Sequence, residues 1–211
     1  MNIAITTLAA AIAALTGAAS AWAEPQVLHY EIRKDGEAIG SEIVRIDSQG
    51  TDLVVDVENH SRATVLFMDF VFDQRRHEEW RGAALRKMTS RTNDDGTVTQ
   101  LEVRHGADGW AITVNGAGVN RPVDALPASL WTDKVVGTSS LFGTIDATAY
   151  AVQVTNLGQE NLPLGGRMLS AAHYRLSGDL ERELWYGADG TLLKTSFKRK
   201  GFPIEFVLVA P

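Results

Sequence analysis

The densest group of side chains that could perform chemistry is the run His77-Glu78-Glu79. In an extended strand His77 and Glu79 share one face, and an imidazole beside a carboxylate suits zinc or iron. Two arginines directly precede the run, so a charged outer face with ion pairs explains the pattern more simply. We therefore predict no metal site here. His173, which alternates with Ala171 and Arg175, is interpreted as ordinary strand surface.

The sequence lacks the motifs of a reactive nucleophile. It contains no cysteine, and Ser129 has none of the flanking glycines that let a nucleophile elbow turn tightly. We interpret Ser129 instead as a residue that begins a helix. Asp94 and Asp95 stand between Asn93 and Gly96, which predicts a turn rather than a pair of catalytic acids. The sequence thus predicts no catalytic residue, no metal and no cofactor.

Apolar side chains form a more informative set. Leu66, Met68, Phe70 and Phe72 recur at every second position and give the most apolar strand face of the chain. Trp131 belongs to an irregular stretch, where an indole ring could cover a cavity. We predict that these five residues bind an apolar ligand. For any single tryptophan, filling the core is the simpler alternative.

Strands must position these side chains, because the hydrophobic period from Val27 onward is two. The clearest alternating runs are residues 28–32, 53–57, 66–72, 110–114 and 204–208. Pairs such as Asp35-Gly36, Asp108-Gly109 and Lys200-Gly201 separate such runs and favour hairpin turns. The pattern predicts an all-β, mainly antiparallel fold of about ten to twelve strands, which must curl into a strongly curved meander sheet or a barrel-like fold.

Residues 115–148 interrupt this rhythm with two prolines and several glycines. Within them, Pro127 suits the first turn of a helix, and Leu130, Trp131 and Lys134 fall on neighbouring helical positions. We therefore predict one short helix over residues 128–136 in a long loop. This loop either covers the mouth of the sheet as a lid or caps the open end of the core.

The amino-terminal segment predicts export. Residues 1–23 carry no charged side chain, and their apolar stretch from Ile3 to Ala14 is too short to span a bilayer. Ala21-Trp22-Ala23 offers the small side chains that signal peptidases accept. We predict a cleaved signal peptide at residues 1–23, a single β-rich domain at residues 24–211, and a periplasmic or secreted location.

The cysteine content, the length of the apolar stretches and the net charge limit the classes of partner that the chain could have. No cysteine near residue 23 is available for a lipid anchor, and no later stretch is long and apolar enough for a transmembrane anchor. The net charge of −6 argues against nucleic acid as a partner. An apolar small molecule or lipid, or another envelope protein, remains.

Several short stretches across the chain point together to one family. They are Tyr30-Glu31-Ile32, Ile39-Gly40 and residues 90–96, 127–131, 173–180 and 184–186. On these stretches the chain resembles a family of uncharacterised exported bacterial proteins of similar length, a domain of unknown function. The resemblance implies no established activity for any residue. More loosely, the predicted layout is similar to periplasmic lipoprotein-localisation carriers and other curved-sheet proteins that hold acyl chains.

Two functional hypotheses follow. The first is an exported binding or carrier module for a lipid or other apolar ligand, which needs only a concave apolar surface with a few polar groups at its mouth. The alternative is a structural or interaction protein of the cell envelope, with a solid core, no ligand and an exposed edge strand or loop. A hydrolase built from His77, Glu79, Asp94 and Ser129 is a third hypothesis, but the sequence favours a protein that is not an enzyme.

Overall fold

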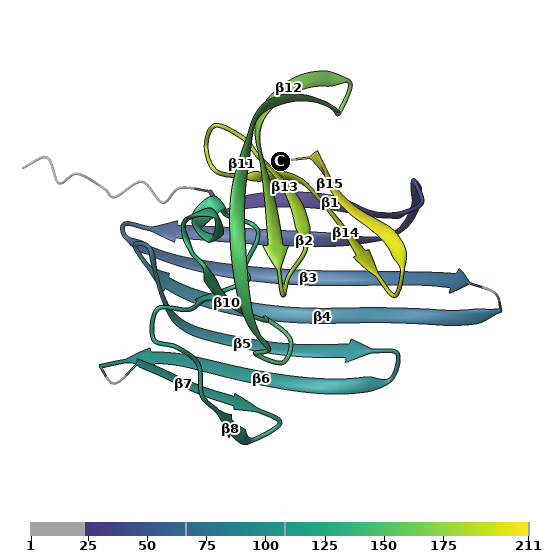
Figure 1. Cartoon of the computed structure of the whole chain (residues 1–211). Helices are drawn as coiled ribbons and strands as arrows, with labels where there is room; N and C mark the ends of the chain where they lie inside the picture. The colour runs from purple at the N-terminus through teal and green to yellow at the C-terminus, as the bar shows by residue number, and fades with distance from the viewer. Residues whose placement is uncertain (1–23, 66, 108, 211) are drawn as a thin grey trace, which may run out of the picture.

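The computed structural model describes residues 24–65, 67–107 and 109–210. The predicted signal peptide at residues 1–23 lies outside these ranges. Within them, fifteen strands form one sheet in the order β8-β7-β6-β5-β4-β3-β2-β1-β15-β14-β13-β12-β11-β10-β9 (Figure 1). The strands are β1 Gln26–Lys34, β2 Glu37–Gln49, β3 Asp52–Val65, β4 Met68–Arg81, β5 Ala84–Asp94, β6 Thr97–Gly106, β7 Gly109–Val114, β8 Ala117–Val119, β9 Leu126–Pro127, β10 Ser140–Phe142, β11 Ala149–Leu164, β12 Arg167–Gly178, β13 Arg182–Tyr186, β14 Leu192–Arg199 and β15 Phe202–Ala210.

The sheet is a meander in which strands that follow one another along the chain pair, except β8 and β9, and one further pairing joins the first and last strands. That pairing, of β1 with β15, is antiparallel. All other pairs are antiparallel except β9 with β10, which is parallel. Because β8 and β9 remain as edges, the sheet is strongly curved but open. The predicted all-β, mainly antiparallel curved fold is confirmed. The hydrophobic period did not predict the very short strands β8, β9 and β10, because each spans too few residues to show a period.

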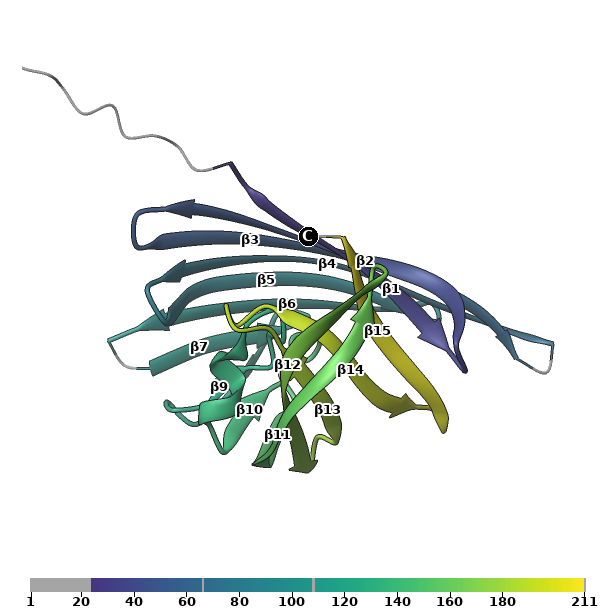
Figure 2. The same cartoon turned by 90° about the horizontal axis from the view of Figure 1, so that it is seen from above.

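The curvature folds the sheet into two layers. Figure 2 shows β3–β7 as one curved layer, with β11–β15 crossing on its concave side and β9 and β10 beside β11. Aliphatic and aromatic side chains from both layers fill the interior, including Val55, Val57, Leu101, Phe142 and Leu184. Their alternation with exposed neighbours explains why these segments are strands, since only the period-two face enters the core.

The predicted helix over residues 128–136 is wrong in its bounds and type. The structure has a 3₁₀ helix, η1, at Asp133–Gly137. It begins later because residues 126–127 pair as β9 and the Ser129 hydroxyl is bonded to Glu78. Ser129 therefore does not begin the helix, whose preceding residue Thr132 makes no capping side-chain bond. In the part of the chain that is described, no helix has the length and apolar character to cross a membrane.

Candidate ligand-binding pocket

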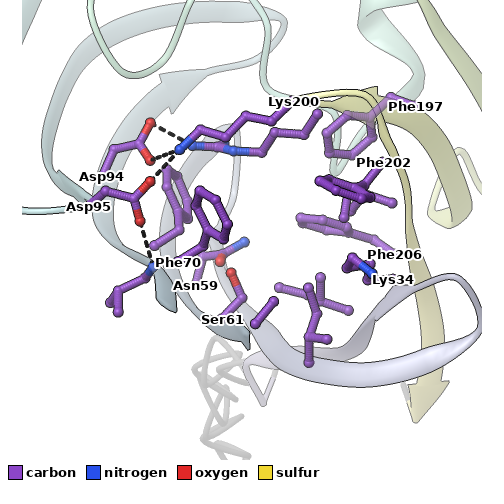
Figure 3. A pocket seen from close by; sticks show the side chains of 17 residues that line it. Lys34, Asn59, Ser61, Phe70, Asp94, Asp95, Phe197, Lys200, Phe202 and Phe206 are labelled. Atoms are coloured by element: carbon purple, nitrogen blue, oxygen red, sulfur yellow. Dashed lines mark hydrogen bonds and ion pairs between the residues drawn. The ribbon is translucent and has the colours of Figure 1, made fainter. Parts of the chain in front are cut away.

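An apolar pocket opens at one end of the curved sheet, where β3, β4, β14 and β15 meet. Its volume is about 90 Å³. Figure 3 shows Phe70 on one side of the space and Phe202 and Phe206 on the other. Phe72 and Phe197 complete a set of five phenylalanines, and three isoleucines add to the lining. We call this space the phenylalanine pocket.

Strand alternation places these rings together. Phe70 and Phe72 are two residues apart on β4 and face the concave side, as do Phe202 and Phe206 on β15. Two of the predicted ligand-binding residues, Phe70 and Phe72, thus line one pocket. The β15 rings were not predicted as site residues, although their own alternation was visible in the sequence.

The other predicted ligand-binding residues lie elsewhere. Met68 is 57% exposed and does not line the phenylalanine pocket. Leu66 lies outside the described residues. Trp131 is buried, lines a separate inner cavity, and packs edge-on against Trp80 with ring centroids 6.0 Å apart. Its segment lies deep between the two layers, so Trp131 does not cover the phenylalanine pocket.

Cationic side chains surround the mouth of the phenylalanine pocket and lie over its rings. Lys34 Nζ is 4.7 Å from the Phe202 centroid, and Lys200 Nζ is 4.7 Å from that of Phe70. The Arg199 guanidinium carbon is 4.6 Å from the Phe72 centroid. Each cation is attracted to the negative face of the ring, and each is also paired with an aspartate at the rim.

Two distant turns meet at this rim. Arg199 Nη2 lies 2.6 Å from Asp94 Oδ2, and Lys200 bonds Asp95 in the same turn. Asp95 also accepts a hydrogen bond of 2.7 Å from the backbone N–H of Val71. The Lys200 ammonium and this N–H lower the pKa of the Asp95 carboxyl. We call these contacts the turn latch, because they join the β5–β6 and β14–β15 turns beside the pocket.

A buried carboxylate fastens the irregular segment to the sheet. Glu78 is fully buried, and its Oε1 accepts hydrogen bonds of 2.6 Å from both Arg76 Nε and Ser129 Oγ. Its Oε2 accepts bonds of 2.8 Å from Trp80 Nε1 and 3.0 Å from Trp131 Nε1. Four donors compensate for the desolvation of this charge. Ser129 and Trp131 therefore position the segment after β9, and Ser129 is not free to act as a nucleophile.

The candidate hydrolase residues are not brought together. His77 lies on the outer face of β4, where its Nδ1 is 2.8 Å from Asp56 Oδ1, whereas Ser129 bonds Glu78 on the inner face. The predicted charged outer face at His77 is thus observed, and Asp94 and Asp95 lie at the predicted turn. Among the described residues, no group of three His, Cys, Asp or Glu side chains is arranged to hold a metal ion.

His173 has more contacts than the sequence indicated. Its ring stacks on Trp185 with centroids 4.3 Å apart, and its two nitrogens lie 3.0 Å from Glu160 and 2.7 Å from Glu183. Trp185 Nε1 also donates to Glu160 at 2.7 Å. These contacts join strands β11, β12 and β13 through their side chains. Both ring nitrogens of His173 therefore already have a partner within the protein.

Comparisons with known proteins define a family and a fold. A family model described as "Domain of unknown function (DUF6134)" matches residues 30–209. The crystal structure of a beta-barrel-like protein of domain of unknown function DUF1849 from Brucella abortus is similar, with a TM-score of 0.65 at 10% identity over 88% of this chain and 95% of that one. A DUF1089 family protein from Pseudomonas aeruginosa matches with a TM-score of 0.38 and 11% identity, over 86% of this chain and 95% of that one. No curated protein matches the sequence.

Proposed function

The chain belongs to the DUF6134 family of domains of unknown function, and we propose that it is a binding or carrier module for a lipid or other apolar molecule. The observation that carries this proposal is the phenylalanine pocket. Five aromatic rings converge on a space that they do not fill, at an open end of the sheet. Apolar ligands are held by such concave, aromatic-lined surfaces with a few polar groups at the mouth.

The size of the pocket limits the occupant. Pockets for drug-sized ligands occupy about 300–1,000 Å³, whereas the phenylalanine pocket has about 90 Å³. An acyl chain that enters here is therefore short, or only its end is enclosed. The rim cations Lys34, Arg199 and Lys200 are each paired with an aspartate, so the charges at the mouth are balanced and the ligand is held mainly by the apolar lining.

Displacement of a fluorescent medium-chain fatty acid from the purified chain tests this function. Phe70→Ala and Phe202→Ala remove rings from opposite walls of the pocket. Each is expected to weaken binding about tenfold, because a large apolar contact surface with the ligand is lost. Phe67→Ala is the matched control, since Phe67 lies on the β3–β4 turn with its side chain fully exposed. Native mass spectrometry after organic extraction identifies any molecule that copurifies.

The outcomes separate the two functional hypotheses. Probe binding that responds to Phe70 and Phe202 but not to Phe67 supports the carrier. A chain that copurifies with nothing and takes up no probe has no ligand, and this result would favour an interaction protein of the cell envelope.

We also propose that the protein works outside the cytoplasm, in the periplasm or after secretion. The support is the signal-peptide pattern of residues 1–23. Protein recovered from the periplasmic fraction is expected to begin at Glu24 when its intact mass is measured. A full-length chain confined to the cytoplasm would overturn this proposal.

A further inference from the structure

A second cavity lies deeper in the interior, beside the phenylalanine pocket. Its volume is about 120 Å³. Phe72, Phe197 and Phe206 line both spaces and so form the boundary between them. Half of the residues that line the second cavity are polar, and it is more polar than the first; the polar residues include Glu42, Asn59, Gln74, Arg76, Arg182 and Thr195. We call it the polar cavity.

Two buried polar atoms in the polar cavity have no partner. Asn59 is 5% exposed and Thr195 is 1% exposed. Among the residues that the structure describes, Asn59 Oδ1 and Thr195 Oγ1 form no hydrogen bond. Buried polar atoms in proteins almost always have partners, so the Thr195 hydroxyl is available to donate to a polar group in the cavity, and Asn59 Oδ1 can accept a hydrogen bond there.

Arg182 differs from the other arginines at the polar cavity. Arg76 is bonded to Glu78 and Gln74, and Arg199 is bonded to Asp94. The described residues provide no hydrogen bond or ion pair to the side chain of Arg182, whose guanidinium carbon instead lies 3.8 Å from the Phe197 ring centroid. Burial lowers the pKa of Arg182 to about 10, so the side chain is still a cation at neutral pH. Its planar donors suit a carboxylate.

The acid that faces the polar cavity directly is Glu42. Its Oε2 accepts a hydrogen bond of 2.8 Å from Asn59 Nδ2. Burial raises the pKa of Glu42, while Arg76 and Arg182 partly oppose that shift. Glu42 and Arg182 both line the cavity but form no ion pair among the described residues, whereas Arg76 and Arg199 are each paired with an acid.

We propose that the polar cavity receives the carboxylate head of a short amphipathic acid whose hydrocarbon chain lies in the phenylalanine pocket. This proposal rests on the proposed function, and it adds the chemical class of the ligand and the orientation in which it binds. In this arrangement Arg182 and the Thr195 hydroxyl donate hydrogen bonds to the carboxylate. Two adjoining spaces, one polar and inner and one apolar and outer, match the two ends of such a molecule. A phospholipid head group is too large for a cavity of about 120 Å³.

Isothermal titration of the purified chain with octanoate and octan-1-ol tests the proposal, because the two ligands share a chain length and differ in head charge. Octanoate is expected to bind about tenfold or more tightly than the alcohol. Arg182→Gln should weaken octanoate binding about tenfold and leave octan-1-ol binding unchanged. Arg175→Gln on the exposed face of β12 is the matched control and should affect neither ligand.

Thr195→Val keeps the side-chain shape while removing the unpartnered hydroxyl, and it should also weaken octanoate selectively. It serves where Arg182→Gln fails to give a wild-type circular dichroism spectrum. Equal binding of acid and alcohol, with no selective loss in either variant, overturns the inward carboxylate but leaves the carrier function standing if Phe202→Ala weakens both ligands. Failure of wild type to bind either ligand overturns both proposals.

Discussion

Arg199 and Asp94 are 105 residues apart in sequence, yet Nη2 of the arginine lies 2.6 Å from Oδ2 of the aspartate. This ion pair, with the neighbouring contact between Lys200 and Asp95, joins the two halves of an open sheet at the mouth of the phenylalanine pocket. The sheet edges at β8 and β9 do not close the fold. The turn latch is therefore a contact that holds the pocket end together.

Weakening the turn latch should change ligand kinetics more than stability. Asp94→Asn removes the partner charge of Arg199, and because both side chains are partly exposed we expect a loss of no more than about 1 kcal/mol in the free energy of unfolding. Octanoate should associate several-fold faster by stopped-flow fluorescence, because the turn latch joins the two turns that flank the mouth of the pocket. Asp52→Asn removes a comparable exposed pair with Arg81 and is the control. An unchanged association rate in Asp94→Asn would show that these turns do not restrict access.

Glu78 should be far more sensitive to substitution than its neighbour Glu79. In Glu78→Gln the Arg76 guanidinium loses its buried counter-charge and one indole or hydroxyl donor loses its acceptor, so we expect a loss of about 3 kcal/mol by urea unfolding. Ser129→Ala should cost about 2 kcal/mol. Glu79 lies on the opposite face, with 43% of its side chain exposed and paired with Lys87. Glu79→Gln should cost less than about 0.5 kcal/mol, and equal losses at the two positions would contradict the assigned faces.

Charges on both faces explain why the sequence did not reveal the Glu78 cluster. Residues 74–79 alternate between Gln74, Arg76 and Glu78 inside and Arg75, His77 and Glu79 outside. Period two separates these sets, but it gives no sign of which one is buried when both are polar. The partner Ser129 lies 51 residues away, and a contact of that range leaves no local pattern.

Only one wall of the phenylalanine pocket could be predicted from the sequence, for a similar reason. The apolar face of β4 is readable from Phe70 and Phe72 alone. Its opposite wall, Phe202 and Phe206, has an equally clear alternation, yet the meeting of β4 with β15 depends on the curvature of the whole meander and on the pairing of β1 with β15. Trp131 lines the polar cavity and not the phenylalanine pocket, and the sequence could not tell the two apart because loop residues carry no period that indicates which cavity they face.

Gly40 should tolerate no side chain. It pairs with Ser61 in the β2–β3 ladder, and a Cβ added there would fall on the carbonyl oxygen of His60 and lie 2.6 Å from the Ser61 Cα. Both obstacles are backbone, so the strand must shift, and we expect Gly40→Ala to cost about 2 kcal/mol in urea unfolding. Gly106→Ala, where an added Cβ meets nothing within 4 Å, should change stability by no more than about 0.5 kcal/mol. Similar stability in the two variants would contradict the close approach of β2 to β3.

Glu42 should make the protein less stable as the pH rises from acid to neutral. Burial raises its pKa above the ordinary value of 4.5 in the folded state, so the folded chain binds this proton more tightly than the unfolded chain does. The free energy of unfolding therefore decreases as pH increases from about 4.5 through the raised value. Glutamine cannot ionise, and Glu42→Gln is therefore expected to be more stable than wild type at pH 7 and equally stable below pH of about 4.

Glu79 provides a comparison of opposite sign for the same titration of urea midpoints. The Lys87 ammonium lowers the pKa of the Glu79 carboxyl, so its ion pair stabilises the fold above the unfolded pKa and is lost as pH falls. Glu79→Gln should thus be slightly less stable than wild type at pH 7 and converge with it in acid. If Glu42→Gln behaves in the same way as Glu79→Gln, then Glu42 is ionised in the fold and Arg182 already has its counter-charge. In that case the polar cavity has no unbalanced cation to attract a carboxylate, and octanoate selectivity should be absent as well.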